Sequence, residues 1–584
     1  MMFARGRVPR ADYPIITVLT LVAIYHLTLL DRGTWSWPDE HLYTDALNAV
    51  AHALNLDVAG FCKSLTGFGA RPAEATLRLA PAAIQTLFDK LWGVSPFNPQ
   101  SLRIAAAPNI LVSFLLGLVF YKLALLFYEG ERWTATWATS VYALLVSSNV
   151  YIRHVVPYDT ALLFGLLALY WLLNSRMSET SLNKKRWVMA GLLSGVSLLA
   201  YPVVFLLYRP AGLAAATFCL ICLIGSLRMM AGDGVASENR RWIITGLLAG
   251  FGLALYPAYY AFPGALLAII VLGKTEPPYI GFSWARLRAG ALYGWSVLCV
   301  VFFYEVVARL GGESYLGCAY RLSRTITQGS FEEAYVFLPR FFVEVERAIG
   351  VLLLVLALAY FVTLLWRLGK RVPLSWSQAA LALCCMVLTG VYLVYATQSV
   401  FLQKMVFTGR YIHFYIPFVV WAAIAALRQI PMTRWRRLAY AGTVLVSVYS
   451  FIGFVREYRE LAYPINVLYD HGIRWEDVVE ENKVYETSVI PGWAYTLPAK
   501  GFCGQANYVT EKHERRYLLV NFGHFDMAGG FAPYHPPSDA QLIYKKRHFL
   551  VFSASRFEGY TLTRRRDMKE RDYHVRIYKL PDAP

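Results

Sequence analysis

The sequence predicts an all-α polytopic membrane protein with a small C-terminal α/β domain outside the membrane. Hydrophobic residues make up 57% of its 584 residues and charged residues only 16%, whereas soluble chains carry about 25% charged residues. Runs of about 17–25 apolar residues, the length that a bilayer demands of a helix, exclude a purely soluble enzyme. Such runs, nearly free of charge, lie at 105–127, 187–207, 211–227 and 242–272.

About thirteen segments are expected to cross the membrane, beginning with an uncleaved first helix, because no small-residue cleavage site follows it. Pro257 and Pro263 leave open whether the seventh and eighth spans are two helices or one long kinked helix. The expected spans are 14–30, 103–127, 133–149, 160–174, 187–207, 211–228, 242–257, 260–273, 289–309, 347–367, 377–397, 411–428 and 438–455.

The charge of the connecting segments predicts their orientation. With a cytoplasmic N-terminus, the inside segments carry 21 Lys and Arg residues and the short outside segments carry seven, as the positive-inside rule requires. We therefore expect a multi-pass protein of the plasma or inner membrane, with a membrane domain at 1–455. The loops 31–102 and 310–346 and a soluble domain at 456–584 would then lie outside.

The outer segments show local patterns of their own. Amphipathic stretches around 41–56 and 71–92 suit helices that lie along the membrane surface. The tail has strand-like runs at 516–522, 548–554 and 573–579, separated by turns rich in Gly and Pro.

The net charge of +18 does not indicate a nucleic-acid partner. The tail at 456–584 is nearly neutral, with 19 basic and 17 acidic residues, and the remaining excess lies mostly between apolar runs. Of the eight cysteines, Cys62, Cys318 and Cys503 fall in outside segments. A disulfide among them is compatible with this placement, but its pairing cannot be deduced from the sequence.

Acidic residues are scarce near the outer helix ends, which draws attention to Asp39, Glu40 and Asp159. A carboxylate near a membrane boundary is costly unless it is hydrated, paired or functional. Each of these residues alone also fits a solvated loop acid, and Asp159 fits a helix N-cap. Their occurrence on one side of the membrane favours a common site.

In order and sidedness these motifs resemble the GT-C superfamily of membrane glycosyltransferases, in particular the branch with the aminoarabinose transferases of lipid A and the protein O-mannosyltransferases. The resemblance covers the membrane part, is strongest over 14–210, and does not extend to the tail. Its motifs are Asp39-Glu40-His41-Leu42-Tyr43 after the first helix, Asp159 after Arg153 and His154 at the fourth helix, and Arg410-Tyr411 before a proline-bearing helix.

The resemblance implies an inverting transfer of a sugar from a polyprenyl-phosphate donor to an acceptor hydroxyl or phosphate at the outer face. The acceptor would be a glycolipid or a cell-envelope glycan, or alternatively a protein. Asp39 is expected to be the general base, and Glu40 an alternative base or a group that orients the acceptor. Asp159 would orient a catalytic or substrate group, or pair with Arg153 or Arg410.

A lipid-phosphate leaving group needs cationic stabilisation, and Arg binds phosphate in a bidentate manner. No cofactor or metal is expected, because Asp39 and Glu40 are adjacent and lack the Asp-x-Asp spacing of metal-dependent members. A cluster with His41 is the remaining alternative. The expected donor-binding residues are Tyr43, Arg153, His154, Lys404, Arg410 and Tyr411, with Lys63, Arg71, Arg321 and Arg324 as weaker candidates.

Two other classes of function fit parts of the sequence. A lipid or sugar transporter would use broken helices and a buried acid such as Glu305, which can pair with Arg309. A sequence similarity between the segments 187–202 and 242–257 slightly favours a transporter with an internal repeat, although similar helix packing explains it as well. A non-catalytic envelope assembly protein would use the tail as a binding module.

Overall fold

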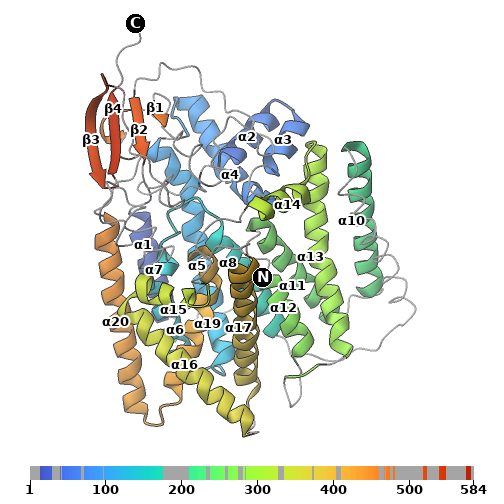
Figure 1. The fold of residues 1–584 in the computed structure, drawn as a ribbon, viewed down its shortest axis with the longest axis vertical. Helices are drawn as coiled ribbons and strands as arrows, with labels where there is room; N and C mark the ends of the chain where they lie inside the picture. The colour runs from blue at the N-terminus through green and yellow to red at the C-terminus, as the bar shows by residue number, and fades with distance from the viewer. Residues whose placement is uncertain are drawn as a thin grey trace.

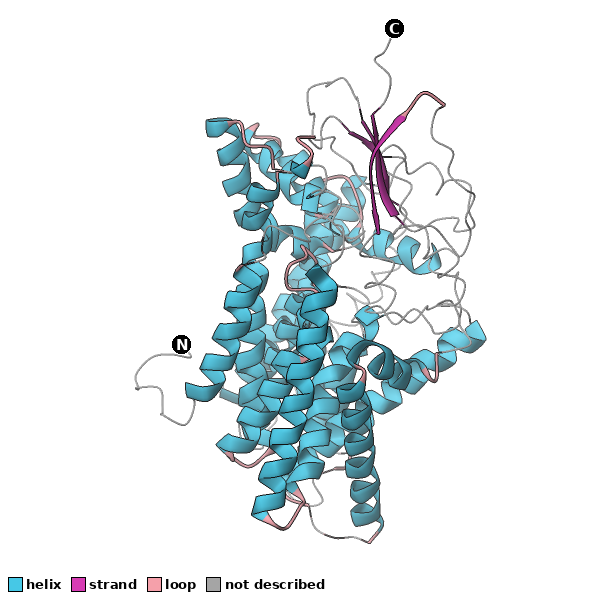
Figure 2. Ribbon diagram, turned by 90° about the vertical axis from the view of Figure 1, so that its left-hand side faces the viewer, coloured by secondary structure: helices cyan, strands magenta, loops and turns pink. Residues whose placement is uncertain are grey.

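A computed structural model shows a bundle of helices with a small β-sheet beyond one end (Figure 1). Figure 2 shows the sheet edge-on from the side, above the long helices. The structure describes residues 13–28, 30, 40, 43–66, 71–96, 98–174, 209–231, 237–256, 261–273, 280–282, 284–325, 334–370, 372, 374–402, 409–459, 466, 469–473, 478–480, 517–521, 538–547 and 574–579.

The first part of the chain forms one apolar helix, three helices of the 31–102 loop, and then the core of the bundle. Local signals mark several ends: the Asp57 side chain accepts a hydrogen bond from Gly60 N at 2.9 Å, and Gly93 ends its helix with φ at 63°. The helices are α1 (Tyr13–Leu27), α2 (Tyr43–Leu54), α3 (Val58–Leu65), α4 (Pro72–Trp92), α5 (Pro99–Phe127), α6 (Arg132–Leu144), α7 (Val146–Asn149) and α8 (Tyr158–Leu173).

The second part adds the remaining helices of the bundle and short helices at its outer end. They are α10 (Arg209–Ala231), α11 (Ser237–Leu255), α12 (Ala261–Leu272), α13 (Trp284–Leu310), α14 (Tyr315–Thr325), α15 (Phe337–Phe341), the π-helical turn η5 (Phe342–Glu346), α16 (Ala348–Gly369), α17 (Trp376–Leu402), α18 (Gly409–Ile412), the 3-10 turn η6 (His413–Tyr415), α19 (Ile416–Arg428) and α20 (Thr433–Arg459).

Six helices of the described part are long and apolar enough to cross a membrane, which is consistent with an integral membrane protein. Four shorter apolar helices lie at Tyr13–Leu27, Tyr158–Leu173, Ala216–Arg228 and Phe262–Leu272. A helix lies at every expected span except 187–207, which is outside the described residues. The number thirteen remains a prediction. The six long spans are Pro99–Phe127, Arg286–Leu310, Ala348–Arg367, Trp376–Leu402, Gly409–Arg428 and Thr433–Arg456.

The expectation of one continuous span at 133–149 is wrong, because the helix breaks at Leu145, whose backbone is extended. The break is stabilised by Glu346, a fully buried residue of η5. Its carboxylate accepts hydrogen bonds from Val146 N and Ser147 N, each at 2.8 Å. A carboxylate from a distant element thus caps α7 and separates it from α6.

The alternative of one long kinked helix around Pro257 and Pro263 is also resolved, since α11 and α12 are separate. Gly252 of α11 and Phe262 of α12 both lie against the same stretch of α8, near Phe164 and Gly165. Two residues ten positions apart on a straight helix would be about 15 Å apart along its axis. α11 and α12 therefore pack against the same part of α8 as two separate helices.

The described part of the tail contains a four-stranded mixed sheet, which joins strands far apart in the sequence. The strand order is β1-β2-β4-β3; β1 and β2 are parallel, and the other pairs are antiparallel. β2 and β4 match expected strands, β3 was not expected, and the expected strand at 548–554 lies outside the described residues. The strands are β1 (Val478–Glu480), β2 (Tyr517–Asn521), β3 (Gln541–Arg547) and β4 (His574–Lys579).

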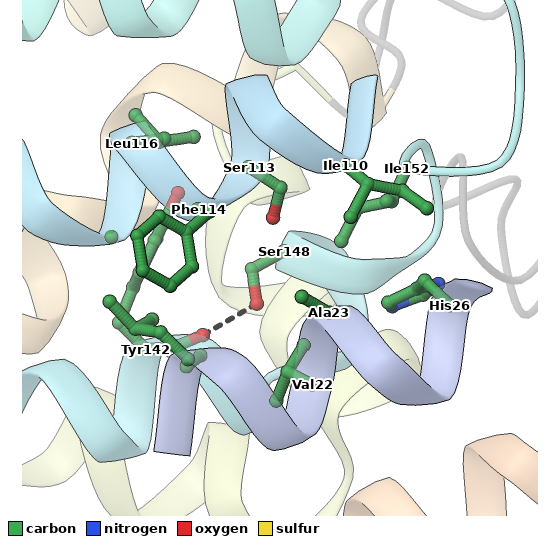
Figure 3. A pocket seen from close by; sticks show the side chains of 13 residues that line it. Val22, Ala23, His26, Ile110, Ser113, Phe114, Leu116, Tyr142, Ser148 and Ile152 are labelled. Atoms are coloured by element: carbon green, nitrogen blue, oxygen red, sulfur yellow. Dashed lines mark hydrogen bonds between the residues drawn. The ribbon is translucent and has the colours of Figure 1, made fainter. Parts of the chain in front are cut away.

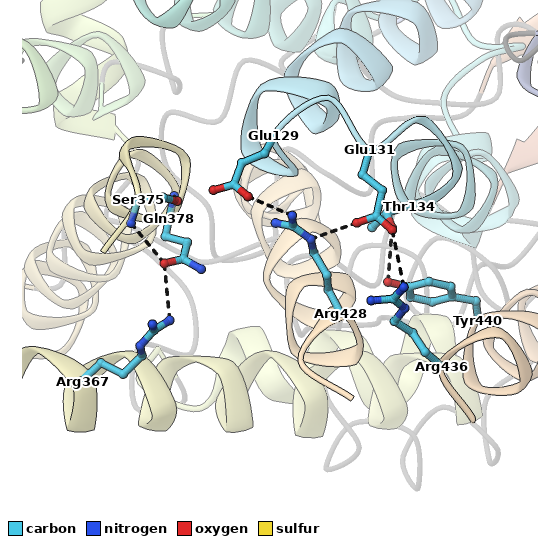
Figure 4. Close-up of polar contacts among 9 residues, drawn as sticks. All are labelled: Glu129, Glu131, Thr134, Arg367, Ser375, Gln378, Arg428, Arg436 and Tyr440. Atoms are coloured by element: carbon cyan, nitrogen blue, oxygen red, sulfur yellow. Dashed lines mark hydrogen bonds and ion pairs between the residues drawn. The ribbon is translucent and has the colours of Figure 1, made fainter. Parts of the chain in front are cut away.

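The opposite end of the bundle is held together by ion pairs between its turns (Figure 4). Arg428, at the end of α19, donates to Glu129 and Glu131 in the α5–α6 turn, each at 2.9 Å. Arg436 of α20 lies 3.9 Å from Glu131. The α5–α6 turn and the segment that joins α19 to α20 therefore meet at this end of the bundle.

Cys318 of α14 is disulfide-bonded. Among the described residues, the free thiols are those of Cys62, Cys219, Cys222, Cys299, Cys384 and Cys385, and Cys503 lies outside the described residues.

Peptide mapping of the purified protein without reductant should therefore yield a linked peptide that contains Cys318. Reduction, or the change Cys318→Ser, should abolish this linked species. A free Cys318 thiol in the unreduced protein would contradict the disulfide.

Candidate functional site

The candidate site surrounds residues 150–157, the irregular segment between α7 and α8. Every residue of this segment is buried, so its backbone polar groups need partners within the protein. Glu40, fully buried, provides one of them: its carboxylate accepts a hydrogen bond from Val155 N at 2.7 Å. His154 Nδ1 lies 3.3 Å from the other Glu40 oxygen. Through these contacts, Glu40 of the acidic motif after α1 binds the segment that leads to Asp159.

Two further side chains hold the same segment. Arg78 of α4, only 5% exposed, donates to Val156 O at 3.2 Å and to Asn109 Oδ1 at 2.8 Å. Asn109 of α5 in turn donates to His154 O. Arg78 also interacts electrostatically with Glu40 and Glu74. Residues from three elements therefore converge on one buried loop.

Asp159, in the first turn of α8, pairs with a histidine from the far end of the sequence. His413 Nε2 lies 2.7 Å from Asp159 Oδ1, and both side chains are at least nine-tenths buried. Next to this pair, Arg410 donates to Tyr158 Oη at 3.2 Å, with its guanidinium 5.8 Å from the centre of the Tyr158 ring. Two contacts thus join α8 to the 410–413 segment.

Aromatic rings extend this cluster towards α4. The Tyr158 ring contacts Tyr151 at 4.8 Å and Tyr256 at 4.9 Å between centroids. Arg71, which precedes α4, stacks over Tyr256 at 4.9 Å. Arg71 and Arg410 therefore lie over neighbouring tyrosines, and both suit recognition of an anion.

The outer helices carry a second group of buried polar residues. Tyr43 donates to Gln85 Oε1 at 2.5 Å, which locks α2 onto α4. Burial raises the pKa of Asp45 well above its usual value, and the nearby Glu74 carboxylate raises it further. Asp45 thus favours its neutral form, while Arg71 lies 3.7 Å from Glu74.

On the other side of the segment, Arg153 is buried with its guanidinium 5.8 Å from the Tyr25 ring. His26 Nε2 lies 2.9 Å from Asn149 Oδ1. His26 also lines a cavity of about 20 Å³ between α1, α5 and the α6–α7 break (Figure 3). That volume holds about one water molecule, so this cavity is no substrate site.

The structure brings together most of the residues that the sequence singled out. Glu40, His154, Asp159 and Arg410 lie around the 150–157 segment, and Tyr43 lies nearby on α2. Tyr411 is half-buried beside Arg410. Among the described residues no group of three His, Cys, Asp or Glu side chains suits a metal ion. Asp39, His41 and Lys404 lie outside the described residues.

Three residues of the cluster do not stand out in the sequence: Arg78, Asn109 and His413. One signal was present, since His413 follows Arg410 by three positions, a spacing that puts both on one face of a helical turn. Arg78 follows Glu74 by four positions, which suggests a mutual surface pair. Its inward contacts with Asn109 and Val156 depend on tertiary packing.

No family model, curated protein or solved structure matches the chain. The geometry is therefore interpreted by its own chemistry. Buried carboxylates beside imidazoles can accept and return protons. Arginines over tyrosines can hold an anionic group. Both kinds of group meet around the 150–157 segment, within one cluster of side chains.

The carboxyl of Asp45 should make stability depend on pH. Its pKa is raised in the folded protein, so the folded state loses stability as pH rises above about 4, where the unfolded chain ionises. Asp45→Asn should therefore raise the melting temperature at pH 7, and the gain should shrink towards pH 4. Thermal melting of the detergent-solubilised protein between pH 4 and 8 measures this difference.

Asp57→Asn is the matched control. The Gly60 N–H bond, assisted by His52, lowers the pKa of this exposed carboxyl. The variant should lose stability at pH 7, and its deficit should disappear as pH falls. The same pH trend in both variants would contradict the assigned electrostatics.

Proposed function

We propose that the chain is a membrane glycosyltransferase that moves a sugar from a polyprenyl-phosphate donor to an extracytoplasmic acceptor, with inversion at the anomeric carbon. The anchoring of Glu40 to Val155 at 2.7 Å carries this proposal. Asp39 directly precedes Glu40, and consecutive Cα atoms lie about 3.8 Å apart. The proposed base would therefore join the cluster that contains Asp159 and Arg410.

The residues divide the chemistry between them. Asp39 accepts the proton of the acceptor as its oxygen attacks the anomeric carbon. Arg410, held by Tyr158, meets the donor phosphate, on which charge develops as the glycosidic bond breaks. Both Glu40 oxygens have partners inside the protein, which favours an anchoring role over that of a base. No metal is needed for this division of roles.

The disulfide supports the proposed sidedness. Disulfides persist in oxidising compartments and are rare in the cytosol. Cys318 lies in the 310–346 loop, at the end of the bundle where the charge bias expects the outside. The C-terminal domain and the acidic motif would then face a periplasm, a cell surface or a secretory lumen.

The alternative functions have less support. Glu305, the acid that a transporter would use, accepts hydrogen bonds from Arg309 Nε at 2.7 Å and from Leu316 N at 2.9 Å. These contacts join the end of α13 to α14, away from the middle of the span, as a structural role requires. An assembly protein would not need buried acids paired with imidazoles. We favour a glycolipid or an envelope glycan as acceptor; transfer to a protein hydroxyl would use the same chemistry.

A transfer assay tests the proposal. Purified protein would receive radiolabelled polyprenyl-phosphate sugars and an extract of its own cell envelope. We expect wild-type transfer, and a decrease of about 10²–10⁴-fold for Asp39→Asn, because the amide cannot accept a proton. Asp57→Asn, the same change at an exposed acid of the same loop, should transfer like wild type.

Melting temperatures would confirm that both variants are folded. No wild-type transfer from any donor would refute the proposed activity. Equal transfer by the Asp39 variant and wild type would leave the activity intact but remove Asp39 as its base.

A further inference from the structure

The Asp159–His413 pair has two buried polar atoms that its own contact does not use. Within the described part of the chain, neither Asp159 Oδ2 nor His413 Nδ1 has a hydrogen-bond partner. His413 is 1% exposed and Asp159 4%. A buried polar atom without a partner destabilises the folded state, so native proteins keep such atoms for a ligand, a water molecule or catalysis.

The contact with Asp159 determines the chemistry of the imidazole. Because the carboxylate oxygen accepts from Nε2 at 2.7 Å, the ring presents Nδ1 as its second functional atom. A buried carboxylate also stabilises the imidazolium that forms when Nδ1 takes up a proton. Neutral His413 thus offers an acceptor at Nδ1, and protonated His413 offers an N–H donor.

The surroundings place this atom beside an anion-binding group. Arg410 lies three positions before His413, is 6% exposed, and donates to Tyr158, the neighbour of Asp159. The Tyr151 ring meets the imidazole edge-on at 5.3 Å between centroids.

The elements packed against η6 include α8, α18 and α19. Phe262 of α12 and the titratable Tyr392 of α17 also contact its Phe414 and Tyr415 rings. The charged and titratable groups that these elements and the 150–157 segment bring close to His413 are Asp159, Tyr158, Arg410, Tyr411, Tyr415 and Tyr151.

We propose that His413, paired with Asp159, donates its Nδ1–H to the leaving phosphate of the sugar donor and acts as the general acid of the transfer. This inference rests on the proposed function. It assigns the two carboxylates different tasks: Asp39 removes a proton from the acceptor, and Asp159 holds the His413 ring so that Nδ1 can supply one.

Every bond, electron pair and proton of the transfer step is accounted for. The acceptor oxygen forms a bond to the anomeric carbon, and its proton goes to the Asp39 carboxylate. The bond from that carbon to the phosphate oxygen breaks, and its electron pair stays on the phosphate. The Nδ1 proton of His413 moves to the phosphate, as suits two groups that ordinarily titrate near pH 6–7. Solvent then removes the proton from Asp39 and returns one to His413.

His413→Gln tests this role, with His26→Gln as its matched control. His26 is also a fully buried histidine near the 150–157 segment, but its Nε2 faces the amide of Asn149 where that of His413 faces a carboxylate. We expect His413→Gln to lower kcat about 10²-fold, with a smaller change in the KM for donor. In wild type kcat should fall at alkaline pH as the imidazolium is lost, and this limb should be absent from the variant. His26→Gln should keep both kcat and the pH profile.

Binding of polyprenyl monophosphate, the leaving group itself, gives a readout independent of turnover. Its thermal stabilisation of the protein should indicate at least a 10-fold weaker affinity for His413→Gln than for wild type or His26→Gln. If His413→Gln does not fold, Asp159→Asn replaces it. That variant should lower kcat as well, because the His413 ring loses the carboxylate that holds it.

Two results would overturn the inference while the proposed function stands. If His413→Gln keeps the wild-type kcat and pH profile, Nδ1 only binds a water molecule. If both histidine variants lose activity equally with unchanged pH profiles, His413 has a structural role. No wild-type transfer from any donor would instead refute the proposed function, and the general-acid role with it.

Discussion

The burial of an irregular loop constrains the whole outer end of this protein. Residues 150–157 form no regular helix or sheet, and local bonds such as those of His154 N to Tyr151 O and Val156 N to His154 O satisfy only part of their backbone. Because the segment is buried, its other backbone groups need partners within the protein. Glu40, Arg78 and Asn109 supply hydrogen bonds to this loop. Because these residues belong to the first outer loop, to α4 and to α5, burying the segment also fixes the acidic motif and the outer helices onto the bundle. The position of Asp159, two residues after the segment, follows from the same contacts.

The two ends of the bundle use charge in different ways. At the end drawn in Figure 4, Arg428 and Glu131 are each at least a quarter exposed and join turns; exposed pairs of this kind contribute about 0–1 kcal/mol each. At the outer end the pairs are buried, and the cost of removing charges from water can exceed their attraction. Glu40 with His154 and Asp159 with His413 therefore demand an explanation beyond stability. Acid–base chemistry at an anion site provides one, and it also accounts for the arginines and tyrosines that surround them.

Much of this arrangement is predictable from the sequence, because it depends on composition and on local chemistry. Apolar runs locate the helices, since a membrane helix satisfies its backbone internally and only its side chains meet lipid. The scarcity of outer acids draws attention to Glu40 and Asp159 for the same energetic reason. The break at Leu145 is not predictable, because it depends on the carboxylate of Glu346, two hundred residues away. His413 and Arg78 are likewise determined by tertiary contacts, although the spacing of Arg410 and His413 on one helical turn carried part of that information.

The most direct test of the account is a structure of the protein in lipid nanodiscs with polyprenyl monophosphate. The account predicts that the phosphate binds within hydrogen-bond distance of His413 Nδ1 and of the Arg410 guanidinium, with the Asp39 carboxylate facing it across the space that a sugar would fill. A phosphate bound away from the 150–157 segment, or Asp39 directed away from that space, would contradict the account.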